Sequence, residues 1–365
     1  MKKLNSIQFY GMPLPIYAFF AIIVLACAYF NIIPNQMIGA VAVLFAFGIL
    51  IGEIGERLPI WNKFLGGGAM LCFLAAGLLK YFNLLPECVT NVSDGWINGY
   101  SFLNVFITFL VVGSLLGIDR DVLIKSGSLY IPTLLCSLLG ACVFGVVAGL
   151  IFGNDPLYLI TSYVLPIMGG GMGAGAVPLS KIFESSGTMT AAEAISIMTP
   201  AVAIGNAISI VLGGILVKVI HSKELNGQGK LMRSADAADE LGVSEEMQAK
   251  RDHIDVRNMG IGMFISCSFF AWGYIVAKIW DTLVPSISIH AYAWMIISVA
   301  VCKIFNIIPE DIEVDCYQWF QFIMKNLTPA LLVGIGLCYL ELGTVISSFS
   351  LTYLVLCFLS CIGAF

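Results

Sequence analysis

A glycine-rich stretch, IMGGGMGAGAVP at residues 167–178, interrupts an apolar segment and directly follows Pro166. Proline lacks the backbone N–H and its ring clashes with the preceding turn, and each glycine raises the free energy of a helix. In membrane hydrocarbon, backbone groups freed by such a break must find partners. The stretch therefore predicts irregular backbone at membrane depth that lies against protein or a water-filled cavity, the kind of place where ligands bind.

The composition is that of a membrane protein. Hydrophobic residues make up 59% of the chain, charged residues only 11%, and the mean hydropathy is +0.93. Charged residues make up roughly 25% of a typical soluble domain. The N-terminal apolar run is long and has no small-residue cleavage site, so we interpret it as a first spanning helix and not as a signal peptide. The net charge of −5, without a basic stripe, gives no indication of a nucleic-acid partner.

Apolar segments recur along the whole chain and predict an all-α polytopic membrane protein of about ten transmembrane helices plus one re-entrant hairpin. The expected helices cover residues 14–33, 37–51, 64–85, 101–118, 128–152, 194–220, 259–280, 291–308, 327–343 and 345–365. The glycine-broken segment, residues 157–180, is the expected hairpin. The chain thus divides into an N-terminal membrane region (1–220), a hydrophilic linker (221–258) and a C-terminal membrane region (259–365). We interpret the linker as solvated, because no phosphate loop or nucleophile motif occurs in it.

Lysine and arginine predict the orientation, because loops rich in these residues lie in the cytoplasm. They occur at Lys2 and Lys3, at residues 57–63 and 120–125, and throughout the linker. The turns between these clusters are poor in positive charge, so residue 153 is expected outside and the linker inside. A single helix, 194–220, joins the two sides. Segment 157–180 must therefore enter and leave on the outer side, as a hairpin that opens outward.

The tip of this hairpin is a candidate binding site for a carboxylate. Pro178 suits the start of a new helix, where its missing N–H does no harm. The N–H groups of residues 173–176 would then lie near a helix N-terminus, whose positive partial charge favours carboxylates. The predicted substrate-binding residues are Gly171, Met172, Gly173, Ala174 and Gly175.

Carbonyl groups on the incoming arm are candidate ligands for a hard cation such as sodium, which prefers oxygen. The predicted sodium ligands are the backbone carbonyls of Ile167, Gly170 and Met172. The alternative is that the small residues only permit close helix packing. Packing glycines are spaced by a helical turn and do not come three in a row, so we favour the binding interpretation here. For the glycine run at 66–68, helix packing or a flexible helix start explains the glycines at least as well as a binding role does.

The remaining reactive side chains predict neither catalysis nor a metal centre. The eleven cysteines lie mostly in apolar segments without a C-x-x-C pair, which is typical of packed thiols. His221, His253 and His290 share no ligand spacing. No nucleophile–base set occurs, so we expect no enzyme. We expect no cofactor either, apart from sodium as a coupling ion.

Residues 165–180, LPIMGGGMGAGAVPLS, resemble the first re-entrant loop of the 2-hydroxycarboxylate transporter family, which includes bacterial sodium–citrate and malate symporters. Segments 43–45, 52–55, 59–63, 130–133, 289–295 and 333–339 also resemble that family, so the similarity covers essentially the whole chain. The resemblance implies two inverted repeats that each carry a hairpin, a homodimer, and elevator-like movement of a transport domain. It also implies sodium-coupled uptake or exchange of di- and tricarboxylates, across the inner membrane of a bacterium.

By position, the resemblance implies that Met172 and Gly173 contact the substrate and that Ile167 and Gly170 offer carbonyls to sodium. The citrate symporters of the family have an asparagine where this chain has Met172. Methionine has no amide to donate to a carboxylate, so malate, citrate and other 2-hydroxy acids all remain open as the substrate.

The family pattern continues beyond Phe365 with a second hairpin, a last helix and arginines that neutralise the substrate, and no arginine follows Arg257 here. Two functions therefore remain open. The first is a sodium-coupled carrier of small organic acids, represented by a C-terminally shortened chain that is expected to transport little or nothing as it stands. The second is a transport-inactive membrane protein that acts only as a binding or assembly partner.

Overall fold

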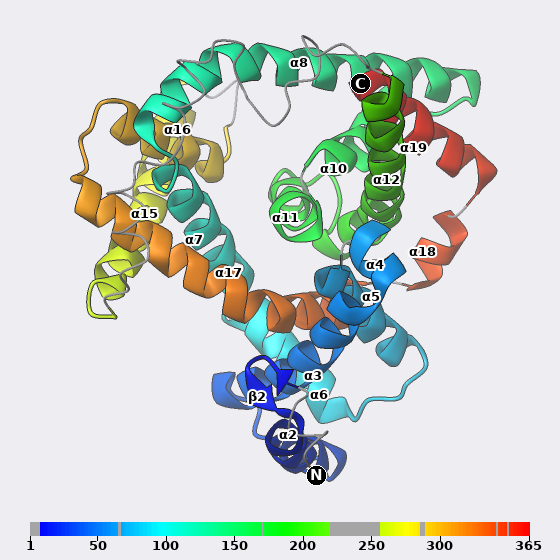
Figure 1. The fold of residues 1–365 in the computed structure, drawn as a ribbon, viewed down its shortest axis with the longest axis vertical. Helices are drawn as coiled ribbons and strands as arrows, with labels where there is room; N and C mark the ends of the chain where they lie inside the picture. Colours follow the sequence, from blue (N-terminus) through cyan, green and yellow to red (C-terminus); the bar gives the residue numbers. More distant parts are fainter. Residues whose placement is uncertain are drawn as a thin grey trace. The chain divides into compact units, whose positions relative to one another are not determined.

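The computed structural model describes residues 8–64, 67–169, 171–219, 256–284, 289–340, 342–348 and 350–365. Most of the linker 221–258 and Gly170 lie outside these ranges. A short antiparallel ribbon, β1 (Gln8–Phe9) and β2 (Met12–Pro13), precedes the first helix. Outside the glycine-broken segment, the helices (Figure 1) are α2 (Leu14–Tyr29), α3 (Met37–Arg57), α4 (Pro59–Phe64), α5 (Gly67–Tyr81), α6 (Glu87–Asp94), η1 (Gly95–Gly99), α7 (Phe102–Leu116), α8 (Arg120–Ile151), α12 (Ala191–Val219), α15 (Met259–Leu283), α16 (Ala291–Ile304), α17 (Glu310–Tyr339), α18 (Leu342–Ser348) and α19 (Leu351–Ala364).

Five helices in the described part of the chain are long and apolar enough to cross a membrane. They are α3, the 131–151 part of α8, the 191–213 part of α12, α15 and α17. The bent pair formed by residues 87–99 and α7 adds a sixth if it is one span. The chain is thus an all-α, multi-pass membrane protein, as the hydropathy pattern predicts. The number of about ten spans stays a prediction.

Two predicted helix boundaries at the C-terminal end are wrong. Helix α17 begins at Glu310 and not at residue 327, because acidic residues in its first turn suit the positive end of a helix. The predicted helix 345–365 is two helices, α18 and α19. Ser350 starts the second one, since its hydroxyl accepts the N–H of Tyr353 at 3.1 Å.

The residues before α7 were expected to form a loop and are helical. Residues 87–94 form α6 and residues 95–99 form η1, and together they make an angle of 53° with α7. Ser101, with a φ of 50°, marks the bend. Trp96 stacks on Phe102 across it, with ring centroids 4.1 Å apart. This broken helix buries Trp96.

The chain forms two compact units. Unit 1 comprises residues 1–103, 137–212 and 327–365, and unit 2 comprises residues 104–136 and 213–326. The boundaries fall inside α8, α12 and α17, and just after the bend at Ser101. These units are defined by contacts in space, whereas the predicted regions 1–220, 221–258 and 259–365 are consecutive along the sequence. That division stays a prediction.

In unit 1, α5 packs closely against α3 through glycines. A methyl group on Gly68 would lie 2.4 Å from the carbonyl oxygen of Gly52, and one on Gly55 would lie 2.6 Å from the Cα of Gly68. The carboxylate of Glu56 accepts the N–H of Gly68 at 2.8 Å and so caps the start of α5. The part of the 66–68 glycine run that the structure describes therefore serves helix packing.

In unit 2, a buried ion pair joins the ends of three helices. Lys303, at the end of α16, donates to Glu313 Oε2 of α17 at 2.6 Å and to the carbonyl of Leu116, the last residue of α7, at 3.0 Å. Lys303 is 2% exposed and Glu313 is 4% exposed. The Nε of Arg120 donates to the carbonyl of Ile304 at 2.7 Å. Cations thus lie at the carboxyl ends of α7 and α16, where helix dipoles favour positive charge.

The start of α16 is capped by a histidine. The Nδ1 of His290 accepts the N–H of Tyr292 at 3.2 Å, and the hydroxyl of Tyr292 donates to Asn104 Oδ1 of α7 at 2.8 Å. Burial lowers the pKa of His290 below its ordinary value of 6.5. The neutral ring is therefore the form that the folded state favours, because only that form can accept the Tyr292 N–H.

We expect unit 2 to lose stability as the pH falls below about 6.5, because the depressed pKa of His290 makes unfolding take up a proton. The same contribution is complete above that pH. Replacing His290 by asparagine, which caps a helix without titrating, is expected to flatten this dependence. Thermal unfolding of both proteins in detergent between pH 5 and pH 8 measures the effect. An equally steep dependence in His290→Asn would contradict it.

Candidate functional site

The glycine-broken segment folds into two helical arms joined by a glycine turn. The first arm consists of α9 (Pro156–Leu159), η2 (Ile160–Val164) and α10 (Leu165–Met168). The second consists of η3 (Met172–Ala176) and α11 (Val177–Ser185). Helix α10 lies beside α12 (Figure 1), where a methyl group on Gly205 would approach the Ile167 side chain to 2.9 Å. The two arms extend the predicted 157–180 segment to residues 156–185.

Both arms contain a widened helical turn just before a proline. In the first arm the N–H of Leu165 donates to the carbonyl of Ile160, and Pro166 follows. In the second arm the N–H of Val177 donates to the carbonyl of Met172, and Pro178 follows. Proline cannot donate to the carbonyl four residues earlier and its ring crowds that carbonyl, so the wider i→i+5 turn relieves the clash.

The turn between the arms depends on glycine at two positions. Gly171 has a φ of 93° and a ψ of −168°, a conformation essentially restricted to glycine. At Gly175, a methyl group would lie 2.5 Å from the carbonyl oxygen and 3.0 Å from the Cα of Gly169. The arms therefore meet backbone to backbone, and the tip has no room for side chains at this contact.

The second arm begins at Met172, with Gly171 as its cap residue, and not at Pro178 as the sequence suggested. The widened turn allows the helix to begin before the proline. The first turn of a helix leaves its N–H groups without partners inside that helix. Here that turn contains Met172, Gly173, Ala174 and Gly175. Three of the four predicted amides, those of residues 173–175, therefore belong to a helix N-terminus, which lies at an earlier residue than predicted.

The structure places the predicted site residues at this turn as follows. Gly171 is at the turn itself, Met172 is 5% exposed, and Gly175 is buried in the contact with the first arm. Ile167 lies in the last turn of the first arm. Gly170 lies outside the described residues. For residues 173 and 174 the structure describes the backbone but not the burial.

One candidate ligand was missed in the sequence. Because Pro178 has no N–H, it cannot donate to the carbonyl of Ala174, four residues earlier. The same argument applies to Pro166 and the carbonyl of Ser162, whose buried hydroxyl also has no hydrogen-bond partner in the described structure. The prolines could have indicated these carbonyls from the sequence, because each proline leaves the carbonyl four residues earlier without its usual helical N–H donor.

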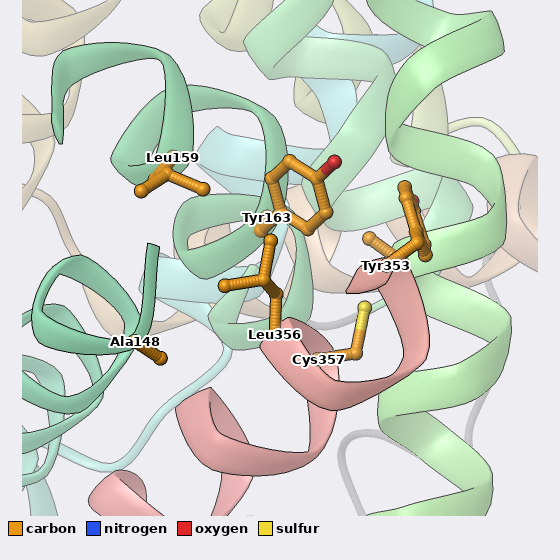
Figure 2. Close-up of a cluster of buried hydrophobic side chains, with 7 residues drawn as sticks. Ala148, Leu159, Tyr163, Tyr353, Leu356 and Cys357 are labelled. Carbon is orange, nitrogen blue, oxygen red and sulfur yellow. The ribbon is translucent and has the colours of Figure 1, made fainter. Parts of the chain in front are cut away.

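The first arm is anchored to α19 and α8 by a buried cluster. Figure 2 shows Tyr163 of the hairpin facing Tyr353, Leu356 and Cys357 of α19. The rings of Tyr163 and Tyr353 are 4.6 Å apart between centroids, and the Tyr353 hydroxyl donates to the carbonyl of Ile197 in α12 at 3.0 Å. The hairpin is therefore supported by apolar packing on a rigid frame, and its tip carries the polar backbone groups.

The chemistry of this site is that of binding. Its polar groups are backbone amides and carbonyls, which can hold an anion and a hard cation but cannot act as nucleophile or base. Among the described residues, no group of three or more His, Cys, Asp or Glu side chains could hold a metal ion. A multi-pass helical protein with a broken, glycine-tipped hairpin has the architecture of the membrane transporter class.

Comparison with known proteins gives the family. The sequence profile of the 2-hydroxycarboxylate transporter family matches residues 9–365. The chain therefore belongs to the 2-hydroxycarboxylate transporter family, as the hairpin motif indicated. It is a transporter and not an enzyme.

Curated relatives match along the whole chain. The citrate/sodium symporter of Salmonella typhimurium is 35% identical over 365 residues, which is 100% of this chain and 80% of the relative. The malate transporter MleP of Lactococcus lactis is 34% identical over 363 residues, or 99% of this chain and 82% of the relative. The citrate transporter CitP of Leuconostoc mesenteroides is 33% identical over 362 residues, covering 99% and 79%.

Proposed function

We propose that the protein is a secondary active transporter of small hydroxy di- and tricarboxylates, malate, citrate or a similar acid, by sodium-coupled symport. The observation that carries this proposal is the hairpin tip, where a helix begins at Met172, so that first-turn amides lie beside glycine backbone. Relatives named as a citrate/sodium symporter and a malate transporter support the substrate class and the coupling ion.

In this proposal the substrate carboxylate accepts hydrogen bonds from the tip, and sodium is held by carbonyl oxygens nearby. The substrate-binding residues are Gly171, Met172, Gly173, Ala174 and Gly175. The sodium ligands are the carbonyls of Ile167, Gly170 and Met172, of which that of Met172 also accepts the N–H of Val177. The carbonyl of Ala174 joins them, because Pro178, four residues later, has no N–H to donate to it. Anion and cation then neutralise one another, which lowers the cost of placing either charge at membrane depth.

We further propose a homodimer with about ten spans per chain and two inverted repeats, in a bacterial inner membrane with the N-terminus in the cytoplasm. An elevator-like movement is compatible with the connections between the two units. Each connection has a helix breaker close to it: the bend at Ser101, Pro132 in α8, Gly213 in α12 and Pro329 in α17. Proline and glycine are where long helices bend.

The residue at position 172 is expected to set the choice of acid. Replacing Met172 by asparagine introduces an amide donor at the start of the second arm. Citrate has one carboxylate more than malate, and a hydrogen bond to it contributes about 1.5–3 kcal/mol, so the affinity for citrate relative to malate is expected to rise on the order of tenfold or more. Competition by unlabelled citrate and malate for labelled substrate measures this ratio. An unchanged ratio would remove Met172 from the substrate contacts.

The transport proposal is tested with the protein encoded by the complete reading frame that contains these residues, in proteoliposomes. We expect labelled malate or citrate to accumulate when sodium is present outside and to stay outside when potassium replaces it. Accumulation that requires a proton gradient and no sodium would contradict sodium as the coupling ion. If no acid accumulates, and the protein is recovered only in stable complexes, the assembly-partner function would be favoured.

A further inference from the structure

Lys181, on the second hairpin arm, lies between a carboxylate and an aromatic ring, away from the hairpin tip. Lys181 is in α11, about 14 Å beyond Met172 if the arm rises 1.5 Å per residue. Its Nζ contacts Glu184 Oε2 at 2.7 Å and lies 5.4 Å from the ring centroid of Tyr339. The lysine side chain is 19% exposed and that of Glu184 is 46% exposed.

Tyr339 is held in place by two other elements of unit 1. Its hydroxyl donates to Asn98 Oδ1 of η1, and its carbonyl accepts the hydroxyl of Ser196 in α12 at 3.1 Å. The ring is therefore a fixed platform beneath the ammonium group, and it favours a cation at this point by cation–π attraction. Lys181 is held over the ring from one side while Glu184 neutralises it from the more exposed side.

We propose that Lys181 is an outer binding residue for the carboxylate of the substrate, with Glu184 as the internal carboxylate that the substrate displaces. This inference rests on the proposed function of the hairpin. An ammonium group has three donors, and in the structure Lys181 interacts with the carboxylate of Glu184 and with the hydroxyl of Tyr339, which leaves one donor for a further carboxylate. Glu184 is the more exposed partner, at 46%, so its carboxylate can turn into water when a second carboxylate takes its place on Lys181. A four-carbon diacid is much shorter than 14 Å, so one molecule cannot contact Lys181 and the tip at once. With the hairpin opening outward, as proposed, contact with Lys181 comes before contact with the tip.

Two substitutions separate this role from that of a structural ion pair. Lys181→Met removes the attracting cation, and we expect the KM for the acid to rise on the order of tenfold with little change in the maximal rate. Glu184→Gln leaves the lysine unpaired, and we expect the KM to fall. Lys181→Arg keeps the charge and is expected to restore a KM close to the original. A purely structural pair predicts that loss of either partner shifts transport in the same direction.

The measurement is uptake of labelled malate and citrate in proteoliposomes at fixed sodium, at low and at high concentrations of a non-sodium salt. The differences between variants are expected to shrink at high salt, because the attraction is screened. The pair Arg57–Glu53, an i,i+4 ion pair at the end of α3, supplies the matched control. Glu53→Gln is expected to leave the KM unchanged.

The outcomes distinguish this inference from the transport proposal. If the unmodified protein transports no acid, the proposed function fails first. If it transports acid but Lys181→Met and Glu184→Gln shift the KM in the same direction, or neither shifts it, the pair is structural and the inference is wrong. Lys181→Arg and Glu184→Gln keep the test decisive if Lys181→Met does not fold.

Discussion

Replacing Lys303 by methionine is expected to lower the free energy of unfolding by about 3–5 kcal/mol, the usual cost of leaving a buried charge without its partner. Glu313 would be left at 4% exposure without its cation, and the carbonyl of Leu116 would lose a donor. Three helix ends of unit 2 depend on this one ammonium group. Glu313→Gln should destabilise by a similar amount, because it strands the lysine instead.

The double substitution Lys303→Met with Glu313→Leu is expected to recover most of the lost stability, since well-packed apolar residues can replace a buried ion pair. Thermal or denaturant unfolding in detergent, with the two single variants and the double variant, measures the coupling between the residues. For comparison, Glu53→Gln, which removes the charge paired with Arg57 at the end of α3, should cost about 0–1 kcal/mol. Equal losses from the two pairs would contradict the role given to Lys303.

Replacing Gly175 by alanine is expected to reduce sodium-dependent uptake on the order of 100-fold, the scale of loss that a displacement of about 1 Å can cause at a binding site. The added methyl group would lie 2.5 Å from the carbonyl oxygen of Gly169, and that contact is with backbone, which cannot rotate away. The arms must separate, and the amides and carbonyls of the tip move with them.

Gly260→Ala in α15 provides the matched control, because a methyl group there meets nothing within 4 Å. Uptake by this variant should be unchanged and its helix slightly favoured. The amount of folded protein in the membrane, measured by size-exclusion chromatography, separates loss of transport from loss of folding. Normal uptake by Gly175→Ala would show that the two arms do not meet as tightly as the glycine contact requires.

Much of this architecture could be predicted from the sequence because it depends on local chemistry. Hydropathy gave most of the spans, and the prolines and glycines of residues 166–178 gave the break. The starts of α2, α3, α15 and α16 agree with their predicted residues, since loop composition changes abruptly there. The family followed from the glycine motif, which combines several backbone constraints in one short stretch.

The features that were missed depend on tertiary contacts. The charges in residues 310–315 are unusual for a span, yet α17 begins at Glu310. Its acidic first turn suits the positive end of a helix, and Lys303 from another helix pairs with Glu313. The helical residues 87–99 were missed because their polar side chains resemble a loop. The start of the second arm at Met172 could not be predicted without knowing of the widened turn. That turn follows from the crowding caused by Pro178, and no sequence pattern indicates it.

The most direct test of the central claim, a hairpin that enters and leaves the membrane on the outer side, is thiol accessibility. Single cysteines at Ser185, the end of the second arm, and at Asn226, in the linker, are introduced into a protein whose own cysteines have been replaced. A membrane-impermeant maleimide added to intact cells is expected to label the cysteine at 185 and to reach the one at 226 only after permeabilisation. Labelling of the cysteine at 185 only after permeabilisation would mean that the segment crosses the membrane and that the hairpin does not exist.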